Sequence, residues 1–587
     1  MKPPFDLQFF ITQIIQDCAE SLSDFPDDFD PAVRSADPRF GDFQANGVLP
    51  LAKKAKKNPR ELASKLMDQL TTHSSLPAEF FELSIAGPGF INFKLTPAFL
   101  TSWVGEFKDP ADLSRGLSHL YAEKKVVMDF SGPNTAKQMH VGHIRSTVIG
   151  EAISRLLAFC GAEVIRDNHI GDWGTQFGIL LLAVKRFGFD FEVDPSLALP
   201  ALEDLYRKGN QEVEEDASAK DEARQELVQL QKGDPERLEL WRKINQISQK
   251  AFDDLYRRLE VSFDETLGES FYRDQVAGVC TELEAQGIAT ESEGALVVFH
   301  PEHSRFNEQP FIIRKSDGAS NYATTDLATV AYRCEEWKAD EIIYVTDGRQ
   351  QDHFEQLFLT VTKWFTAMGK PVPSLRHVWF GTILGEGGKA IKTRSGGSVK
   401  LKDLLDEGVD RARQIVELKN PGLPEEEKDL IAETVGIGAI RYADLMQNRT
   451  NDYLFSWDKM LSFDGNTAPY LLYAVARIHA IFRKAGLDPT SGIDSHSDLE
   501  TDEEILLARQ LALFPSTVIQ VTQDLRPHFL CTYLFDLANT FSSFYNANRV
   551  MVDDLGERNR RLLLCSRTLL FLKTGLNLLG IQTLEQM

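Results

Sequence analysis

The sequence of 587 residues contains no CxxC pair, and its cysteines are scattered singly along the chain. A zinc ribbon needs closely spaced pairs of cysteines, and so few isolated thiols in a long chain give no disulfide framework. We therefore expect no zinc and no disulfides, with reduced thiols that are mostly buried. The six cysteines are Cys18, Cys160, Cys280, Cys334, Cys531 and Cys565.

The sequence also lacks long apolar runs, a targeting segment and an excess of basic charge. The apolar run at 177–184 is far shorter than the roughly 20 residues that a membrane span needs. The N-terminus, MKPPFDLQFF, has no basic region leading into an apolar core. With 87 acidic and 64 basic residues the net charge is −23, which argues against an anionic membrane surface or generic DNA coating. We expect a cytoplasmic protein without a membrane partner, and a specific nucleic-acid partner stays open.

The length predicts several domains, at roughly 100–200 residues per domain. Residues 1–112 mix helix and strand patterns, which indicates an α+β domain. Residues 113–460 alternate strands and helices as in a Rossmann-like parallel sheet, with a charge-dense helical insertion around 190–265. Residues 461–587 show broad apolar helical faces and short connections, which predict an all-α helical bundle. The expected helices of this bundle are 467–483, 503–524, 526–548 and 558–579.

A basic cluster stands out in the first domain because the whole chain is acidic. It is followed by Asn58-Pro59-Arg60-Glu61, which is a good signal for the start of a helix. A solvated surface and a contact with a phosphate backbone are both open interpretations. The cluster consists of Lys53, Lys54, Lys56 and Lys57.

The most informative stretch is the loop at 131–143, SGPNTAKQMHVGH. It joins a predicted buried strand at 124–130 to a predicted helix, as at the opening of a doubly wound parallel sheet. The N-terminus of a helix favours phosphate, and His140 and His143 can donate to phosphate oxygens. Gly142 leaves room for a purine ring against the backbone. By itself the pattern also fits a helix cap or a metal site, and the strand–loop–helix setting favours a nucleotide.

Several long motifs, in order along the chain, resemble those of the arginyl-tRNA synthetases, a family of class I aminoacyl-tRNA synthetases. PNTAKQMHVGH and the following IRSTVIGEA resemble the HIGH region of that family. The resemblance implies an N-terminal additional domain that binds tRNA, a class I catalytic domain and an anticodon-binding bundle. The other motifs are GDFQANGVLPLAKK at 41–54, NHIGDWGTQFG at 168–178, YATTDLA at 322–328, GGKAIKTRSGGSVKL at 387–401 and FDGNTAPYLLYAVARI at 463–478.

The resemblance also implies roles for individual residues. In class I enzymes a KMSKS loop supplies a cationic clamp, and here KAIKT at 389–393 keeps only its outline. Lys392, helped by Lys137, is the expected catalytic cation beside His140 and His143. The implied ATP-binding residues are Pro133, Asn134, His140, Gly142, His143 and Lys392, and the implied arginine-binding residues are Asn134, His143, Glu269, Tyr322, Asp326 and Gln350.

A guanidinium is planar and permanently charged, so its pocket should offer fixed carboxylates and a hydroxyl group. Tyr322 and Asp326 are one helical turn apart and can face the same point. Gln350 and Gln351 are both candidates for the same pocket, and the spacing to His353 favours Gln350.

The implied reaction is activation of L-arginine with ATP, followed by transfer of the arginyl group to the 3′ end of tRNA(Arg). Mg²⁺ would enter with ATP, and we expect a monomer. Two alternatives stay open, a non-catalytic RNA-binding synthetase paralogue and a small-molecule nucleotidyltransferase.

Overall fold

The computed structural model describes residues 3–37, 39–316, 322–385, 387–389, 391, 398–490, 493 and 497–587. The chain forms two compact units, which are described separately. The first comprises Met1–Ala122, Phe159–Gly161 and Leu461–Met587, and the second comprises Glu123–Ala158 and Ala162–Met460.

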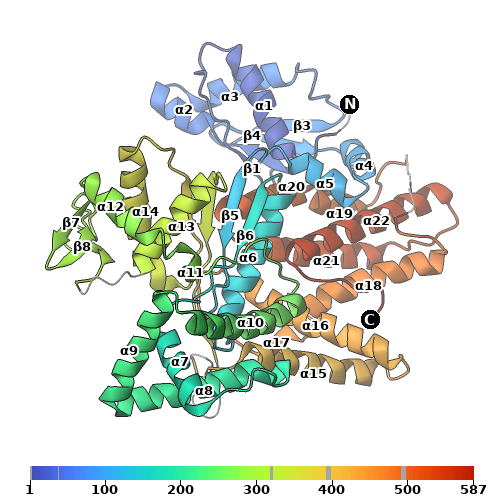
Figure 1. Cartoon of the computed structure of the whole chain (residues 1–587). Helices are drawn as coiled ribbons and strands as arrows, with labels where there is room; N and C mark the ends of the chain where they lie inside the picture. The colour runs from blue at the N-terminus through green and yellow to red at the C-terminus, as the bar shows by residue number, and fades with distance from the viewer. Residues whose placement is uncertain are drawn as a thin grey trace. The chain divides into compact units, whose positions relative to one another are not determined.

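The second unit is built on a parallel four-stranded sheet, at the centre of Figure 1, with the order β11-β10-β5-β6. The apolar run in β5 (Lys125–Asp129) is buried, as expected for a strand covered on both faces. A loop and α6 (Gly142–Phe159) connect β5 to β6 (Glu163–Asp167), which confirms the predicted strand–loop–helix–strand unit. The other strands of the sheet are β10 (Glu341–Tyr344) and β11 (Ser374–His377).

The last strand of this sheet, β11, is short. β11 ends at His377, and beyond it Phe380 makes only an isolated bridge with Asp347. Backbone hydrogen bonds to the segment after β10 continue here, since the N–H of Phe380 donates to the carbonyl of Thr346 at 3.2 Å, and arginine side chains bind other carbonyls of the stretch. Arg145 donates to the carbonyl of Gly381 at 2.7 Å.

The charge-dense region at 190–265 is helical, and its three helices lie beside α7 (Figure 1). Aspartates start these helices because their carboxylates accept the free backbone N–H groups of the first turn. Asp194, Asp216 and Asp234 cap the three helices in this way. The three helices are α8 (Pro195–Glu215), α9 (Ala217–Gln231) and α10 (Pro235–Arg258), and α7 spans Thr175–Phe187.

The rest of the second unit surrounds the sheet with helices and short strands. Helix α6 is joined to α16 by a buried ion pair, in which Arg145 Nε lies 3.1 Å from Asp444 Oδ2. The remaining helices are α11 (Glu269–Tyr272), α12 (Val276–Ala285), α13 (Tyr322–Glu335), the 3₁₀ helix η1 (Gly348–Gln350), α14 (Gln351–Ala367), α15 (Leu401–Lys419), α16 (Glu425–Leu445) and α17 (Trp457–Met460). The remaining strands are β7 (Ala289–Ser292), β8 (Ala295–Val298), β9 (Phe311–Arg314), β12 (Ile383–Leu384) and β13 (Tyr453–Leu454).

The N-terminal part of the first unit is an α+β fold around an antiparallel sheet with the order β1-β2-β4-β3. Asn58 caps α3 as predicted, because its side chain accepts a hydrogen bond from the backbone N–H of Arg60 at 2.9 Å. The elements are α1 (Leu7–Glu20), β1 (Val33–Ser35), β2 (Phe43–Ala45), α2 (Val48–Ala55), α3 (Pro59–Leu70), β3 (Phe81–Ala86), β4 (Phe90–Leu95), α4 (Pro97–Glu106) and α5 (Pro110–Leu117).

The C-terminal part of the first unit is all helical, as predicted. The single helix expected at 503–524 is two helices, because Pro515 lacks the N–H that would continue the helical bonding. The helices are α18 (Ala468–Ala485), α19 (Asp502–Ala512), α20 (Phe514–Asp524), α21 (His528–Ala547) and α22 (Leu555–Leu578).

Among the described residues, one helical stretch, Asp502–Asp524, is long and apolar enough by composition to cross a membrane, and 56% of it is buried. It contains α19 and α20, whose apolar residues face the core of the bundle. The core helices of a folded bundle pass the same test.

The four parallel strands, the α+β N-terminal part and the helical C-terminal part together confirm the predicted fold class. Five of the six cysteines are buried and Cys334 is partly exposed, which confirms the expectation of mostly buried thiols.

Candidate active site

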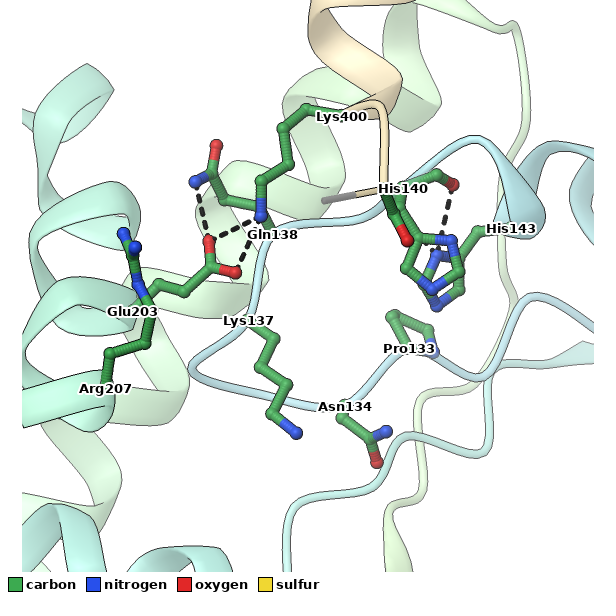
Figure 2. A pocket seen from close by; sticks show the side chains of 10 residues that line it. Pro133, Asn134, Lys137, Gln138, His140, His143, Glu203, Arg207 and Lys400 are labelled. Atoms are coloured by element: carbon green, nitrogen blue, oxygen red, sulfur yellow. Dashed lines mark hydrogen bonds and ion pairs between the residues drawn. The ribbon is translucent and has the colours of Figure 1, made fainter. Parts of the chain in front are cut away.

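A cavity of about 590 Å³ lies beside the loop between β5 and α6, with further walls from α8 and residues 398–400 (Figure 2). Five of the residues predicted to bind ATP or to act in catalysis line this cavity. They are Pro133, Asn134, Lys137, His140 and His143, and the other lining residues are Gln138, Glu203, Arg207, Ser398 and Lys400.

The rings of the two histidines of the loop lie against each other, with centroids 4.1 Å apart and planes tilted by 46°. The backbone N–H of His140 donates to Nδ1 of His143 at 3.0 Å, and the N–H of Gly142 donates to Nδ1 of His140 at 3.0 Å. Because Nδ1 of His140 accepts a hydrogen bond, the proton of its neutral ring is on Nε2, which leaves that Nε2 as a donor. Nδ1 of His143 also lies 3.2 Å from the carbonyl oxygen of His140, so this nitrogen can either accept from the backbone or donate to it, depending on the tautomer. A side chain at Gly142 would place its Cβ 2.8 Å from the His140 ring, so this glycine accommodates the ring.

Both histidines are held in the neutral form. Burial and the neighbouring His140 lower the pKa of His143 to about 4. Burial, followed by the positive charges of Lys400 and Arg349, lowers the pKa of His140. Neutral rings can donate hydrogen bonds to phosphate oxygens without needing a proton from solution.

Of the two predicted catalytic lysines, one lies in the cavity wall and the other is outside the described residues. The ammonium of Lys137 lies 5.3 Å from the centre of the Tyr206 ring, a cation–π contact with α8. Lys392 falls outside the described residues.

Lys400 is a cavity residue that the sequence did not single out. Residues 139–141 pair with residues 399–401: the N–H of Val141 donates to the carbonyl of Val399 at 2.9 Å, and the N–H of Leu401 donates to the carbonyl of Met139 at 2.9 Å. Lys400 follows the glycine-rich stretch of the 387–401 motif, which is a signal that sequence reading could have used. Glu203 and Arg207 lie in the charged insertion, where nothing local distinguishes them from solvated residues.

Asn134 connects the cavity to a second group of polar residues. It forms a bridge with Gly171, and a Cβ at Gly171 would lie only 2.0 Å from its side-chain oxygen. The next residue, Asp172, is buried and accepts hydrogen bonds from the backbone N–H and the hydroxyl of Ser270, at 2.9 and 2.6 Å. Asp172 thereby fixes the start of α11, which places Glu269 beside it.

The predicted arginine-binding residues Glu269, Tyr322 and Asp326 come together here. Glu269 begins α11, and the other two lie in the first turn of α13. Burial, followed by the negative charges of Asp172 and Asp326, raises the pKa of Glu269 to about 8. Burial, followed by Glu269 and Asp326, raises the pKa of the Tyr322 hydroxyl. Carboxylates this close together repel one another when ionised, and a bound cation would stabilise their ionised forms.

Gln350 is not brought into this group by any contact among the described residues. It ends the 3₁₀ turn that precedes α14, and its side chain is exposed. The amide of the neighbouring Gln351 donates to the carbonyl of Gly348 at 2.9 Å.

The basic cluster of the N-terminal part is exposed at the end of α2. Lys56 adopts a left-handed conformation with φ of 53°, which turns the chain between α2 and α3. Lys57 forms an ion pair with Asp24, whereas Lys53, Lys54 and Lys56 are exposed. The described residues contain no group of three or more His, Cys, Asp and Glu side chains that could hold a metal ion.

Comparison with known families accounts for this arrangement. Residues 113–457 match the catalytic domain of the class I tRNA synthetases (R). The chain belongs to the arginyl-tRNA synthetases. Within this family, residues 10–95 match the arginyl tRNA synthetase N-terminal domain, and residues 471–587 match the DALR anticodon binding domain.

Individual relatives agree with this assignment. The chain is 44% identical to an arginine–tRNA ligase of Enterobacter sp. (strain 638) over 568 residues, covering 96% of each chain. It is 45% identical to one of Cellvibrio japonicus over 556 residues, covering 93% of this chain and 94% of the relative. Its structure is similar to the arginyl-tRNA synthetase of Plasmodium falciparum, with a TM-score of 0.82, 28% identity and full coverage of both chains. The family membership confirms the prediction of a class I aminoacyl-tRNA ligase.

Proposed function

We propose that the protein is an arginine–tRNA ligase, which activates L-arginine with ATP and transfers the arginyl group to the 3′ end of tRNA(Arg). The observation that carries the proposal is the continuity between two sites. Asn134 lines the histidine cavity and packs on Gly171. Asp172, which follows Gly171, accepts hydrogen bonds from Ser270 and thereby holds the neighbouring Glu269 in place. A phosphate-binding cavity and a cation-binding group are thus adjacent, as a reaction between ATP and arginine requires.

In the first step the carboxylate of arginine attacks the α-phosphorus of ATP. A bond forms between a carboxylate oxygen and phosphorus, the bond to the bridging oxygen of the β-phosphate breaks, and pyrophosphate leaves with its electron pair. The reaction needs no protein nucleophile, so catalysis depends on position and charge stabilisation. The Nε2–H group of His140 and the ring N–H group of His143 are suited to donate to the phosphate oxygens as negative charge shifts onto them.

The acidic group selects arginine over other amino acids. Arginine and lysine carry the same charge, so attraction alone does not separate them. The guanidinium presents a planar fork of donors, which matches fixed carboxylates from Glu269 and Asp326 with the hydroxyl of Tyr322. The smaller ammonium of lysine would leave carboxylate oxygens unpaired in a partly desolvated site.

Mg²⁺ enters with ATP in this proposal and neutralises part of the triphosphate charge. Among the described residues that line the cavity, Glu203 is the only carboxylate, and it is already paired with Lys400. The phosphate oxygens and water would therefore supply most of the metal ligands.

In the second step a 2′- or 3′-hydroxyl of the terminal tRNA ribose attacks the carbonyl carbon of arginyl-adenylate, and AMP leaves. We assign residues 1–112 and 461–587 to tRNA binding and residues 113–460 to catalysis. In residues 1–112, contacts with the tRNA phosphates come from an exposed cluster of lysines, Lys53, Lys54, Lys56 and Lys57. The protein acts as a cytoplasmic monomer.

Exchange of radioactive pyrophosphate into ATP tests the proposal. The exchange is measured with arginine, ATP, Mg²⁺ and tRNA together, and each of a panel of amino acids replaces arginine in turn. Exchange with arginine alone among them is the expected result. An absence of exchange under all conditions, with tRNA still bound, would instead identify a non-catalytic RNA-binding paralogue.

A further inference from the structure

Lys400 is fixed beside the histidine loop by its backbone. It forms an antiparallel bridge with His140, and hydrogen bonds from Val141 to Val399 and from Leu401 to Met139 hold the residues on either side. The side chain of Lys400 therefore lines the same cavity as His140 and His143.

That ammonium is paired with a single carboxylate. Lys400 Nζ lies 2.6 Å from Oε1 and 2.8 Å from Oε2 of Glu203, and the amide of Gln138 donates to the same Oε2 at 2.7 Å (Figure 2). Burial by itself would raise the pKa of Glu203, but the hydrogen bonds from Lys400 and Gln138 lower it, so the carboxylate is ionised. The pair is partly exposed, with 29% of the Lys400 side chain accessible to solvent.

We propose that Lys400 is a phosphate-binding residue that Glu203 holds in the free enzyme and releases to the triphosphate when ATP enters. This inference rests on the proposed function, since it assigns the cavity to ATP. The proposal adds Lys400 to the residues already expected to bind phosphate, which are His140, His143, Lys137 and Lys392. It also gives Glu203, on helix α8, a role in the affinity for ATP.

The charges of the cavity favour this exchange of partners. In the part of the chain that the structure describes, its lining has three cationic side chains, Lys137, Arg207 and Lys400, and one carboxylate. A triphosphate carries more negative charge than one carboxylate, so it competes for the ammonium whenever both are within reach. The lysine side chain has a flexible four-carbon stem and can change partners while its backbone stays in place. After the exchange, Glu203 keeps the hydrogen bond from Gln138.

The two members of the pair should then have opposite effects on ATP. Lys400→Met removes the cation, and we expect it to raise the Kd and KM for ATP by roughly 10–100-fold, the range for loss of a hydrogen bond to a charged group. Glu203→Gln removes the competing charge and should lower the Kd and KM for ATP by a few-fold. Calorimetric titration with ATP and Mg²⁺ gives the Kd, and pyrophosphate exchange with arginine and tRNA gives the KM and kcat.

Two further variants control the experiment. Lys402→Met removes an exposed lysine two residues away, which is paired with Asp406 at 2.6 Å, and should leave the ATP constants unchanged. Lys400→Arg keeps the positive charge and should bind ATP within a few-fold of the wild type. Thermal unfolding of each variant checks that the fold is intact.

The outcomes separate this inference from the proposed function. If Glu203→Gln weakens ATP binding as Lys400→Met does, the ion pair is only structural and the inference is wrong. Unchanged ATP constants in Lys400→Met, with normal exchange in the wild type, also overturn it. A wild-type protein that gives no arginine-dependent exchange would overturn the proposed function instead.

Discussion

Nε2 of His353 lies 2.6 Å from Oδ2 of Asp326 and joins the first turn of α14 to the first turn of α13. The imidazole ring packs between Phe311 and Phe354, with centroid distances of 5.7 and 5.3 Å. This packing and the hydrogen bond fix one oxygen of the Asp326 carboxylate. Asp326 is thereby preorganised beside Glu269, whose pKa its negative charge helps to raise.

Asp326→Asn is expected to lower kcat/KM for arginine by an amount equivalent to about 3–5 kcal/mol, since it leaves a partly buried guanidinium without its counter-charge. The asparagine keeps the shape of the side chain but replaces one acceptor oxygen with a donor amide. The affinity for ATP should stay nearly unchanged. Steady-state exchange with arginine, measured alongside ATP titration, gives both quantities. Wild-type kcat/KM in this variant would place Asp326 outside the arginine pocket.

His353→Phe tests whether His353 positions that carboxylate. Phenylalanine preserves the aromatic packing but cannot hydrogen-bond Asp326, so we expect the KM for arginine to rise about tenfold or more, the effect of losing a hydrogen bond to a charged group. The value of kcat at saturating arginine and the KM for ATP should change little. His353→Gln retains a donor and should recover part of the loss. Equal damage to the arginine and ATP constants would point to a general disturbance of the fold.

His143→Ala tests the donor from the histidine pair. The ring N–H group of His143 is expected to act on the developing phosphate charge, and loss of one such transition-state donor costs roughly 10²–10³-fold in rate. Single-turnover formation of arginyl-adenylate measures this rate, and the affinity for tRNA serves as the control because it should not change. A normal single-turnover rate would exclude this role for His143.

The sequence was most informative where the structure depends on local patterns. The buried strand at β5, the loop and the periodic apolar face of α6 are encoded by neighbouring residues, so the position of His140 and His143 could be predicted. The first turn of α13 likewise brought Tyr322 and Asp326 together. These parts of the candidate site could be predicted from three local features: the end of a strand, the start of a helix and a spacing of four residues.

Other parts of the site depend on contacts between distant segments. The pairing of residues 399–401 with 139–141 brings Lys400 into the cavity, and the glycine-rich motif before Lys400 does not show with which distant segment it pairs. The same is true of Glu203, which looks like any acidic residue on a solvated helix until Lys400 and Gln138 meet it. Asp172 belongs to a recognisable motif, but only its contact with Ser270 shows that it supports Glu269.

Replacing Lys53, Lys54, Lys56 and Lys57 with glutamine tests the tRNA surface. The acidic chain has few sites that attract RNA, so an exposed basic cluster should bind the phosphate backbone. For every lysine–phosphate interaction that the substitutions remove, the slope of log affinity against log salt concentration should flatten by roughly 0.7–0.9 units. Filter binding of tRNA at several salt concentrations gives the slope. Lys94→Gln, on β4 of the same part and paired with Glu82 at 2.7 Å, is the control. An unchanged slope would show that the cluster is only a solvated surface.

The protonation of Glu269 predicts a pH dependence of arginine binding. Burial and the charges of Asp172 and Asp326 raise its pKa to about 8, so at pH 7 most of the free enzyme carries this carboxyl group protonated. A guanidinium binds best to the ionised form, and binding below pH 8 must therefore release a proton. The Kd for arginine should fall by up to about tenfold per pH unit as the pH rises toward 8, and level off above it.

Calorimetric titration of arginine in buffers with different ionisation enthalpies measures this proton release directly. In Glu269→Gln the release and the pH dependence between pH 6 and 8 should both disappear, with weaker arginine binding throughout and an unchanged affinity for ATP. The stability of the fold should fall over the pH range in which arginine binding strengthens. Because the pKa is raised in the folded protein, Glu269 stabilises the fold below its unfolded pKa, and this contribution is lost as the pH rises through about 8. Glu269→Gln should therefore raise the thermal unfolding midpoint relative to the wild type at pH 8.5 and not at pH 5. An arginine affinity that is independent of pH in the wild type would mean that Glu269 does not contact the guanidinium.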